Sequence, residues 1–185
     1  MKTNLIILAA PSGAGKSSFI EKICSEKKVL FDTITYTTRS MRLGESQGSP
    51  YFYVTEAEFN TKKDQGFFVE WARVHNHLYG TSRVQIEEAW LQDRCVIMDV
   101  DIQGAKTFKD LYPQSRSIFI LPPSIEELRK RIIKRDGKIP TDIEIRMDNA
   151  KKEMKEAAEF DFRIVNDHFE TSYAEFKKII ENLLV

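Results

Sequence analysis

Residues 10–18 have the composition and order of a loop that binds phosphate groups. The segment reads APSGAGKSS, and it matches the pattern G-x-x-x-x-G-K-[ST] except that Ala10 stands at the first glycine position. Glycines at 13 and 15 let backbone amides turn toward phosphate oxygens, and the following helix presents its positive N-terminus. Lys16 would contact β- and γ-phosphates, and Ser17 would bind Mg²⁺. A glycine-rich turn with a solvated lysine is the alternative, which the order strand, loop, Gly-Lys-Ser and helix disfavours.

Asp99 is a candidate partner for this loop. It ends the apolar run 96–98, and an acidic residue at the end of a later buried strand helps to hold magnesium in many phosphate-loop proteins. Asp99 alone would be weak evidence, since many strands end in Asp, but together with the loop it is stronger. A phosphate loop does not separate kinases from ATPases, GTPases or motor domains, so the acceptor must be read from other residues.

Several polar residues between 35 and 81 could bind an acceptor. Arg39 and Arg42 are three residues apart in a turn-like segment, where guanidinium groups can clamp a phosphate. Glu70 lies within the hydrophobic run 68–72. The hydroxyl candidates are Tyr51, Tyr79 and Thr81. Each has a structural alternative: solvation for the arginines, an edge-strand surface charge for the carboxylate, packing for the tyrosines and a helix cap for the threonine.

The segment 129–135 is strongly basic and follows a predicted helix start. Arg131 and Arg135 are four residues apart, so both would lie on one helical face and could meet a transferring phosphoryl group together. An ordinary basic helix surface is the alternative, and the presence of the phosphate loop disfavours it.

Short apolar runs predict the elements that position these residues. The runs 5–9, 95–98, 117–121 and 162–165 are typical of buried strands in a parallel sheet, with helices between them and one helix beginning near Gly15. Between 31 and 80 the pattern changes to short alternating stretches at 31–37, 51–54 and 67–72, with turn residues around Gly44, Gly48 and Pro50. This predicts a small mixed or antiparallel lobe inserted into the parallel fold.

Pairs of Ser or Thr with Glu or Gln three residues later predict several helix starts by the capping-box rule. The pairs are Thr55 with Glu58, Ser82 with Gln85, Ser124 with Glu127, Thr141 with Glu144, and Ser172 with Glu175.

Composition limits the function classes. The 185 residues are 42% hydrophobic and 30% charged, which is typical of a globular protein. Basic and acidic residues number 28 each, so no global field would hold the protein on nucleic acid, and an anionic ligand must be met by local charge. No run approaches the roughly 20 apolar residues of a spanning helix. Met1–Thr3 lead into the first apolar run without a secretory pattern, so we expect a single cytoplasmic domain.

From about Leu5 to the C-terminal helix the chain resembles guanylate kinase, and bacterial members in particular look like it, including the Ala at the first loop position. The segments that carry the resemblance are 10–18, 37–39 with Arg42 and 44–45, 70–71, 79–82, 99–104, 122–124 and 164–167.

The resemblance implies an α/β fold in which a phosphate-loop parallel sheet is flanked by helices and carries an inserted GMP-binding lobe and a small helical lid. In a single domain 1–185, the core would comprise about 1–32, 81–125 and 160–185, the lobe about 33–80 and the lid about 126–159. The implied activity converts GMP and ATP to GDP and ADP with Mg²⁺. The implied partners are these small molecules, without nucleic acid or membrane, in a monomer or homodimer.

The resemblance also implies roles for individual residues. The GMP phosphate would be bound by Arg39, Arg42, Tyr51 and Tyr79, and the guanine by Thr35, Glu70, Thr81 and Asp101. ATP would be bound by Pro11, Ser12, Gly13, Ala14, Gly15, Lys16, Ser17, Ser18, Asn166 and Asp167. Catalysis would rest on Lys16, Arg39, Asp99, Arg131, Arg135 and Arg146. Mg²⁺ would be held by Ser17 and, directly or through water, by Asp99. A carboxylate at Glu70 can accept from both N1–H and the exocyclic amine of guanine, whereas adenine presents an acceptor at N1.

Two positions depart from the family pattern. Asp136 precedes Gly137 where many relatives have Gly directly after the lid arginine, and His168 follows Asp167 where a second aspartate is commoner. We expect lid kinetics or ATP affinity to differ while the reaction stays the same. Two alternatives remain: a non-catalytic binding module, disfavoured by the joint retention of the loop and the arginines, and a kinase for another small phosphate ester, disfavoured by the base-reading residues Glu70 and Thr81.

Overall fold

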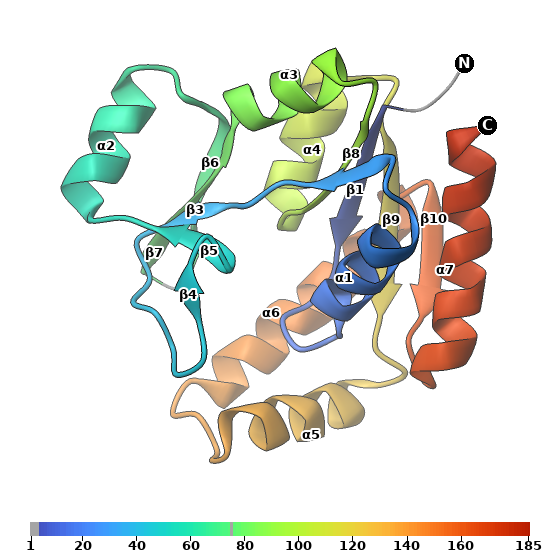
Figure 1. Cartoon of the computed structure of the whole chain (residues 1–185). Helices are drawn as coiled ribbons and strands as arrows, with labels where there is room; N and C mark the ends of the chain where they lie inside the picture. The colour runs from blue at the N-terminus through green and yellow to red at the C-terminus, as the bar shows by residue number, and fades with distance from the viewer. Residues whose placement is uncertain (1–3, 75) are drawn as a thin grey trace.

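A parallel sheet carries the phosphate loop at its centre (Figure 1). The computed structural model describes residues 4–74 and 76–185. The strand order is β10-β9-β1-β8-β2, and every neighbouring pair is parallel. The strands are β1 (Leu5–Ala9), β2 (Leu30–Asp32), β8 (Cys95–Asp99), β9 (Arg116–Leu121) and β10 (Phe162–Val165). The four apolar runs therefore form strands as predicted, and β1 is buried along its whole length because both its edges and both its faces are covered.

Helices cover both faces of this sheet, and alternate side chains of β1 pack on opposite faces. Ile6 and Leu8 join a core with α1 (Lys16–Glu26) and α7 (Phe169–Leu184). Leu5, Ile7 and Ala9 join a second core with residues from other helices. These helices are α3 (Arg83–Leu91), α4 (Ile102–Leu111) and the short η1 (Ala157–Glu159). Over the described residues, no helix combines the length and the apolar character needed to cross a membrane.

A second, mixed sheet forms the lobe, in the order β4-β5-β3-β7-β6. The pairs β6–β7 and β3–β7 are antiparallel, and the pairs β3–β5 and β4–β5 are parallel. Its elements are β3 (Tyr36–Thr37), β4 (Ser46–Gln47), β5 (Pro50–Tyr53), α2 (Glu56–Asp64), β6 (Phe68–Val74) and β7 (His77–Ser82). Phe59, Phe68 and Leu78 form its own small core. The predicted α/β class with an inserted mixed lobe is confirmed.

The stretch 31–37 does not form one strand of the lobe, as the alternation predicted. Its first residues belong to β2 of the parallel sheet, and only Tyr36–Thr37 join the lobe as β3. The side chain of Gln85 bonds both the amide and the carbonyl of Ile34, each at 2.9 Å. The backbone hydrogen-bonding groups of Ile34 are thereby paired at the point where the chain passes from one sheet to the other. The period-two alternation of the sequence does not reveal this crossing.

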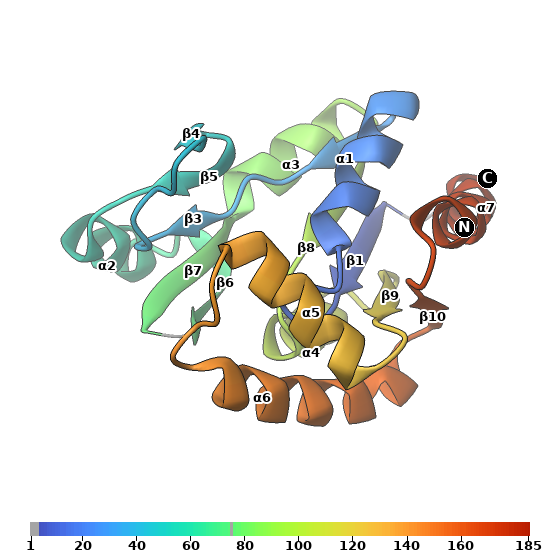
Figure 2. The ribbon, with the colours of Figure 1, turned by 90° about the horizontal axis from the view of Figure 1, so that it is seen from below.

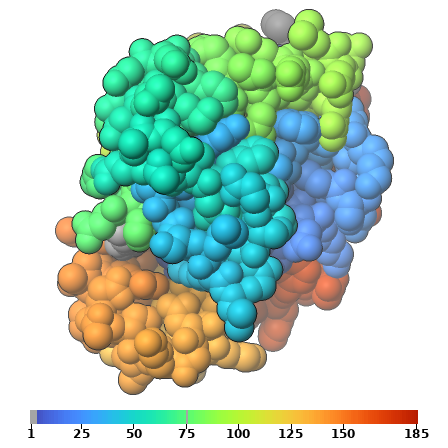
Figure 3. Space-filling view, turned by 60° about the vertical axis from the view of Figure 1, so that its left-hand side comes forward, coloured from blue at the N-terminus to red at the C-terminus, as the bar shows by residue number. Residues whose placement is uncertain are grey.

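The segment predicted as the lid contains α5 (Ile125–Asp136) and α6 (Ile143–Glu156), which lie side by side in Figure 2, and these two helices are called the lid below. Leu128 and Ile132 of α5 pack against Met147 of α6 and against Ala14 of the phosphate loop. The lid core is therefore anchored to the loop itself. Figure 3 shows the surface of the lobe, in cyan and teal, directly above the orange surface of the lid.

Three of the five predicted helix starts are confirmed. Thr55 forms a complete capping box with Glu58. Ser82 and Ser124 cap α3 and α5 by accepting a backbone hydrogen bond, although the partner side chains bond elsewhere.

Two predicted starts are wrong. The residue before α6 is Asp142 rather than Thr141. Ser172 lies inside α7, and its hydroxyl donates to the carbonyls of Val165 and His168. Phe169 packs edge-on against the buried ring of Phe19, with ring centroids 5.1 Å apart, so tertiary packing starts this helix earlier than the local signal.

Candidate functional site

One cleft of about 730 Å³ is lined jointly by the phosphate loop, the lobe and the lid. The predicted site residues that line it are Pro11, Ser12, Gly13, Gly15, Lys16, Ser17, Ser18, Thr35, Arg39, Arg42, Tyr51, Glu70, Tyr79, Asp99, Asp101, Arg131, Arg135 and Arg146. The other four lie around it. Ala14 is buried in the lid core, Thr81 lies behind Glu70, Asn166 lies against the loop, and Asp167 is exposed.

Two glycines with positive φ shape the phosphate loop. Gly13 and Gly15 have φ of 93° and 95°, a region that L side chains rarely adopt. A Cβ at Gly13 would lie 2.7 Å from Cγ1 of Ile132, and one at Gly15 would lie 2.7 Å from Nδ2 of Asn166. Ala10 does not have positive φ, so the first position of the pattern accepts an alanine. The amide of Asn166 donates to the carbonyl of Ala14 at 2.8 Å and so holds the loop.

Lys16 begins α1 and points toward the end of β8. Its Nζ lies 3.2 Å from Oδ2 of Asp99 and donates to the carbonyl of Val100 at 3.4 Å. Asp99 and Ser17 both line the cleft. The loop lysine and the carboxylate that the sequence paired by motif are thus in contact.

Glu70 is held at the cleft by two neighbouring strands. It lies on β6 next to a register shift, and its Oε1 accepts a hydrogen bond from Oγ1 of Thr81 on β7 at 2.9 Å. Burial raises the pKa of Glu70 to about 7, and the nearby carboxylate of Asp101 adds to the effect. Thr81 is buried and is not a helix cap, because Ser82 caps α3.

Asp101 and Gly104, at the start of α4, lie beside the carboxylate of Glu70. Oδ1 of Asp101 accepts from the amide of Gly104 at 2.7 Å, which caps the helix. A Cβ at Gly104 would lie 3.2 Å from Oε2 of Glu70, so the glycine leaves room for the carboxylate. Thr35, in the segment that connects β2 to β3, is buried and lines the same cleft.

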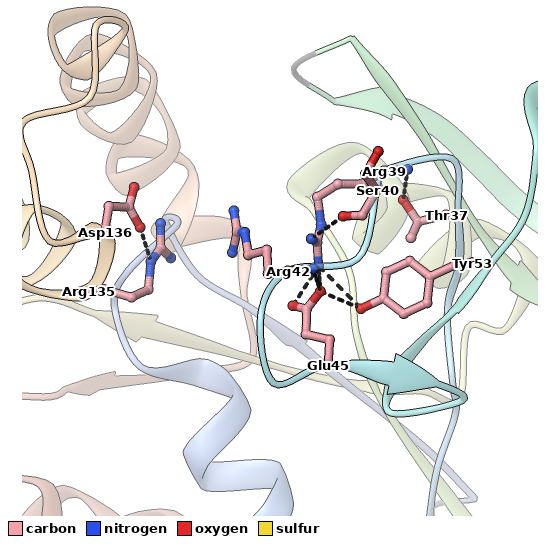
Figure 4. A network of polar contacts seen from close by, with 8 residues as sticks. All are labelled: Thr37, Arg39, Ser40, Arg42, Glu45, Tyr53, Arg135 and Asp136. Atoms are coloured by element: carbon pink, nitrogen blue, oxygen red, sulfur yellow. Dashed lines mark hydrogen bonds and ion pairs between the residues drawn. The ribbon is translucent and has the colours of Figure 1, made fainter.

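Glu45 positions the arginines of the lobe, and sequence reasoning gave it no role (Figure 4). Nη2 of Arg39 donates to both carboxylate oxygens of Glu45, at 2.8 and 2.9 Å. The amide of Arg42 and the hydroxyl of Tyr53 each donate to Oε2 at 2.7 Å. Burial alone would raise the pKa of Glu45, but these donors hold the pKa at about 2. An acid six residues after Arg39 in a loop carries no spacing rule that would have predicted this pairing.

Tyr51 and Tyr79 line the cleft beside Arg39. Their rings meet edge-on with centroids 5.9 Å apart, and the guanidinium of Arg39 lies 5.4 Å from the ring of Tyr51. Burial raises the pKa of Tyr51, so its hydroxyl keeps its proton and remains a donor.

The lid arginines line the opposite wall and each is already hydrogen-bonded. Nη1 of Arg131 donates to the carbonyl of Asn166 at 2.9 Å. Nε of Arg135 donates to Asp136 at 2.8 Å, and Nε of Arg146 donates to Asp142 at 2.9 Å.

Glu153 of α6 also lines the cleft and was not predicted. Burial raises its pKa to about 7, with a contribution from the negative charge of Asp101. It lies in the charged segment 151–156, whose composition is that of a solvated helix face, so the sequence gave no signal for it.

The family model described as guanylate kinase matches residues 2–183. The chain is 59% identical to a guanylate kinase of Bdellovibrio bacteriovorus, and the alignment covers 100% of both chains. It is 43% identical to a guanylate kinase of a Polaromonas species, over 96% of this chain and 86% of that protein. The crystal structure of guanylate kinase from Anaplasma phagocytophilum superposes with a TM-score of 0.81 at 26% identity, covering 100% of this chain and 87% of the other. The chain belongs to the guanylate kinase family.

Proposed function

We propose that the described cleft is where this guanylate kinase transfers the γ-phosphoryl group of ATP to GMP. A phosphate oxygen of GMP attacks the γ-phosphorus, the bond to the β,γ-bridging oxygen breaks, and GDP and ADP leave. The observation that best supports this proposal is that one cleft is lined by the phosphate loop, by the buried carboxylate of Glu70 and by the lid arginines. Such a site needs no covalent enzyme intermediate, because positioning and electrostatic stabilisation carry the reaction.

The phosphate loop is proposed to bind ATP. Amides of residues 11–18 would surround the phosphates at the N-terminus of α1, where the helix dipole favours negative charge. Lys16 would exchange its contact with Asp99 for β- and γ-phosphate oxygens.

Ser17 and Asp99 are proposed to hold Mg²⁺ that accompanies ATP. A hydroxyl and a carboxylate are oxygen donors of the kind this ion prefers, and its usual habit of keeping waters and phosphate ligands fits a site with few protein donors. The ion would supply charge neutralisation at the transferring phosphate.

The lobe is proposed to bind GMP. Arg39 and Arg42 would clamp its phosphate, and Tyr51 and Tyr79 would donate without adding charge. Glu70 would read guanine, supported by Thr81, Thr35 and Asp101. Burial raises the pKa of Glu70 because it removes water from the carboxylate, and the two guanine donors would replace that water and favour the ionised form that accepts from both.

The lid arginines Arg131, Arg135 and Arg146 are proposed to stabilise charge on the transferring phosphoryl group. They come from the two helices of one lid whose core includes Ala14 of the loop, so lid and loop would move as coupled parts. The proposed partners are ATP and GMP, without nucleic acid, and the working unit is a monomer or homodimer.

A coupled assay of ADP formation with GMP, AMP, CMP and UMP in turn tests the proposal. Rapid ADP formation is expected with GMP, and AMP should be poorer by about 10⁴-fold, because a site built around hydrogen bonds rejects a partner that leaves them unmade. Equal rates with AMP, or ADP formation that needs no acceptor, would contradict it.

A further inference from the structure

Asp136, the last residue of α5, contacts two lid arginines at once. Its Oδ1 accepts from Nε of Arg135 at 2.8 Å, and its Oδ2 lies 3.4 Å from Nη1 of Arg146. Arg146 comes from α6, where Asp142 holds its Nε at 2.9 Å. The side chain of Asp136 is 21% exposed and that of Arg146 is 19% exposed. One carboxylate therefore ties together arginines from both helices of the lid.

Helix stability does not explain a carboxylate at this position. The C-terminal end of a helix carries partial negative charge, which disfavours an acid there. The helix is already terminated by Gly137, which has φ of 69°. The hydrogen bond from Arg135 lowers the pKa of Asp136, and the charges of Arg146 and of Arg42 across the cleft lower it further. Figure 4 shows Arg42 between the lobe network and the pair Arg135–Asp136.

The same arginines face the space where phosphates are proposed to bind. Arg42, Arg135 and Arg146 all line the cleft. Carboxylate and phosphate oxygens bind guanidinium forks in the same way, so the two anions compete for the same donors.

We propose that Asp136 is a positioning residue that serves as an internal counter-ion for Arg135 and Arg146, and that phosphate oxygens displace it when they bind. This inference rests on the proposed function of the lid arginines. A single polyphosphate must compete with the Asp136 carboxylate for Arg135 and Arg146, which weakens its binding at the lid. When both substrates are bound, their combined negative charge displaces Asp136 from these arginines.

Direct binding of tripolyphosphate, measured by calorimetry on the full chain, tests this proposal. Asp136→Asn keeps the shape and removes the charge, and it should bind tripolyphosphate about three- to tenfold more tightly, the range expected when one or two part-exposed ion pairs no longer compete. The gain should shrink as salt rises. Asp136→Glu restores the charge and should return the affinity toward that of the original chain. A purely structural role would weaken binding in Asp136→Asn instead.

Asp148→Asn is the matched control. It removes one charge from α6, where Asp148 is 67% exposed and pairs with Lys151 at 3.1 Å. It should leave tripolyphosphate affinity unchanged. Unchanged or weaker binding in Asp136→Asn, or an equal gain in Asp148→Asn, would overturn the counter-ion role. GMP phosphorylation by the unmodified chain is assayed in parallel. If GDP forms and the affinities do not differ, only the counter-ion role fails, whereas a lack of GDP rejects the proposed function itself.

Discussion

Replacing Glu70 with Gln should reduce the use of GMP more than the use of IMP, which keeps N1–H but lacks the exocyclic amine. In the structure Oε1 of Glu70 is already bonded to Thr81 at 2.9 Å, and Oε2 has room beside Gly104. The ionised carboxylate can accept from both guanine donors, whereas an amide that accepts from one donor turns its NH₂ toward the other. GMP therefore loses a bond that IMP never makes.

The magnitude follows from the hydrogen bond that is lost. A hydrogen bond to a charged group contributes roughly 1.5–3 kcal/mol, which corresponds to about 10- to 150-fold in kcat/KM. GMP should exceed IMP by this factor in the unmodified protein, and the ratio should fall toward one in Glu70→Gln. AMP, which presents an acceptor at N1, should stay below both.

Steady-state kcat/KM for GMP, IMP and AMP on each protein provides the assay. Glu56→Gln is a suitable control, since Glu56 lies in the same lobe, is 59% exposed and pairs with Arg73 at 2.8 Å. It should leave the GMP to IMP ratio unchanged. If Glu70→Gln also leaves that ratio unchanged, Glu70 does not read guanine and the reasoning from its burial and partners is refuted.

Three further outcomes are expected. Glu45→Gln should raise KM for GMP several-fold with a smaller change in kcat, because it loosens Arg39; an unchanged KM would argue against this positioning role. The pKa of Glu70 is raised from 4.5 to about 7 in the folded protein, so the unfolding free energy of the original chain should fall relative to that of Glu70→Gln as pH rises from 4.5 to 7. Denaturation curves that give a constant difference between the two proteins across that range would contradict this. Gly13→Ala combines positive φ with a contact to Ile132 and should cost about 1–3 kcal/mol more in unfolding free energy than Gly44→Ala, whose Cβ would meet nothing within 4 Å; equal losses would exclude the steric contribution.

The buried sheet and the phosphate loop could be predicted because their signals are local. A continuous apolar run such as 5–9 fits a strand buried on both faces, and the glycines at 13 and 15 have the φ values that the pattern requires. The lobe was harder, because strands of two residues such as Tyr36–Thr37 carry no periodicity. The start of α7 was missed because the packing of Phe169 against Phe19 depends on residues far apart in the chain.

The pairing of charged residues is the part of the site that could not be predicted from the sequence. Motifs and the family resemblance named the arginines, and the structure brings Arg39, Arg42, Arg135 and Arg146 to one cleft. Sequence reasoning gave Glu45 no role and noted Asp136 only as a departure from the family pattern. Neither pairing could be predicted, because that of Glu45 with Arg39 depends on loop geometry, and that of Asp136 with Arg146 depends on how two helices pack.

The most direct measurement of the central claim is the formation of GDP from GMP and ATP with Mg²⁺, compared between the original chain and Lys16→Ala. Lys16 contacts Asp99 and Val100 at the cleft and is not part of a described core cluster, so the variant should keep its thermal midpoint. The account predicts one GDP for each ATP consumed by the original chain and loss of GDP formation in Lys16→Ala. GDP formation at an undiminished rate in a folded Lys16→Ala protein, or consumption of ATP without GDP by the original chain, would contradict it.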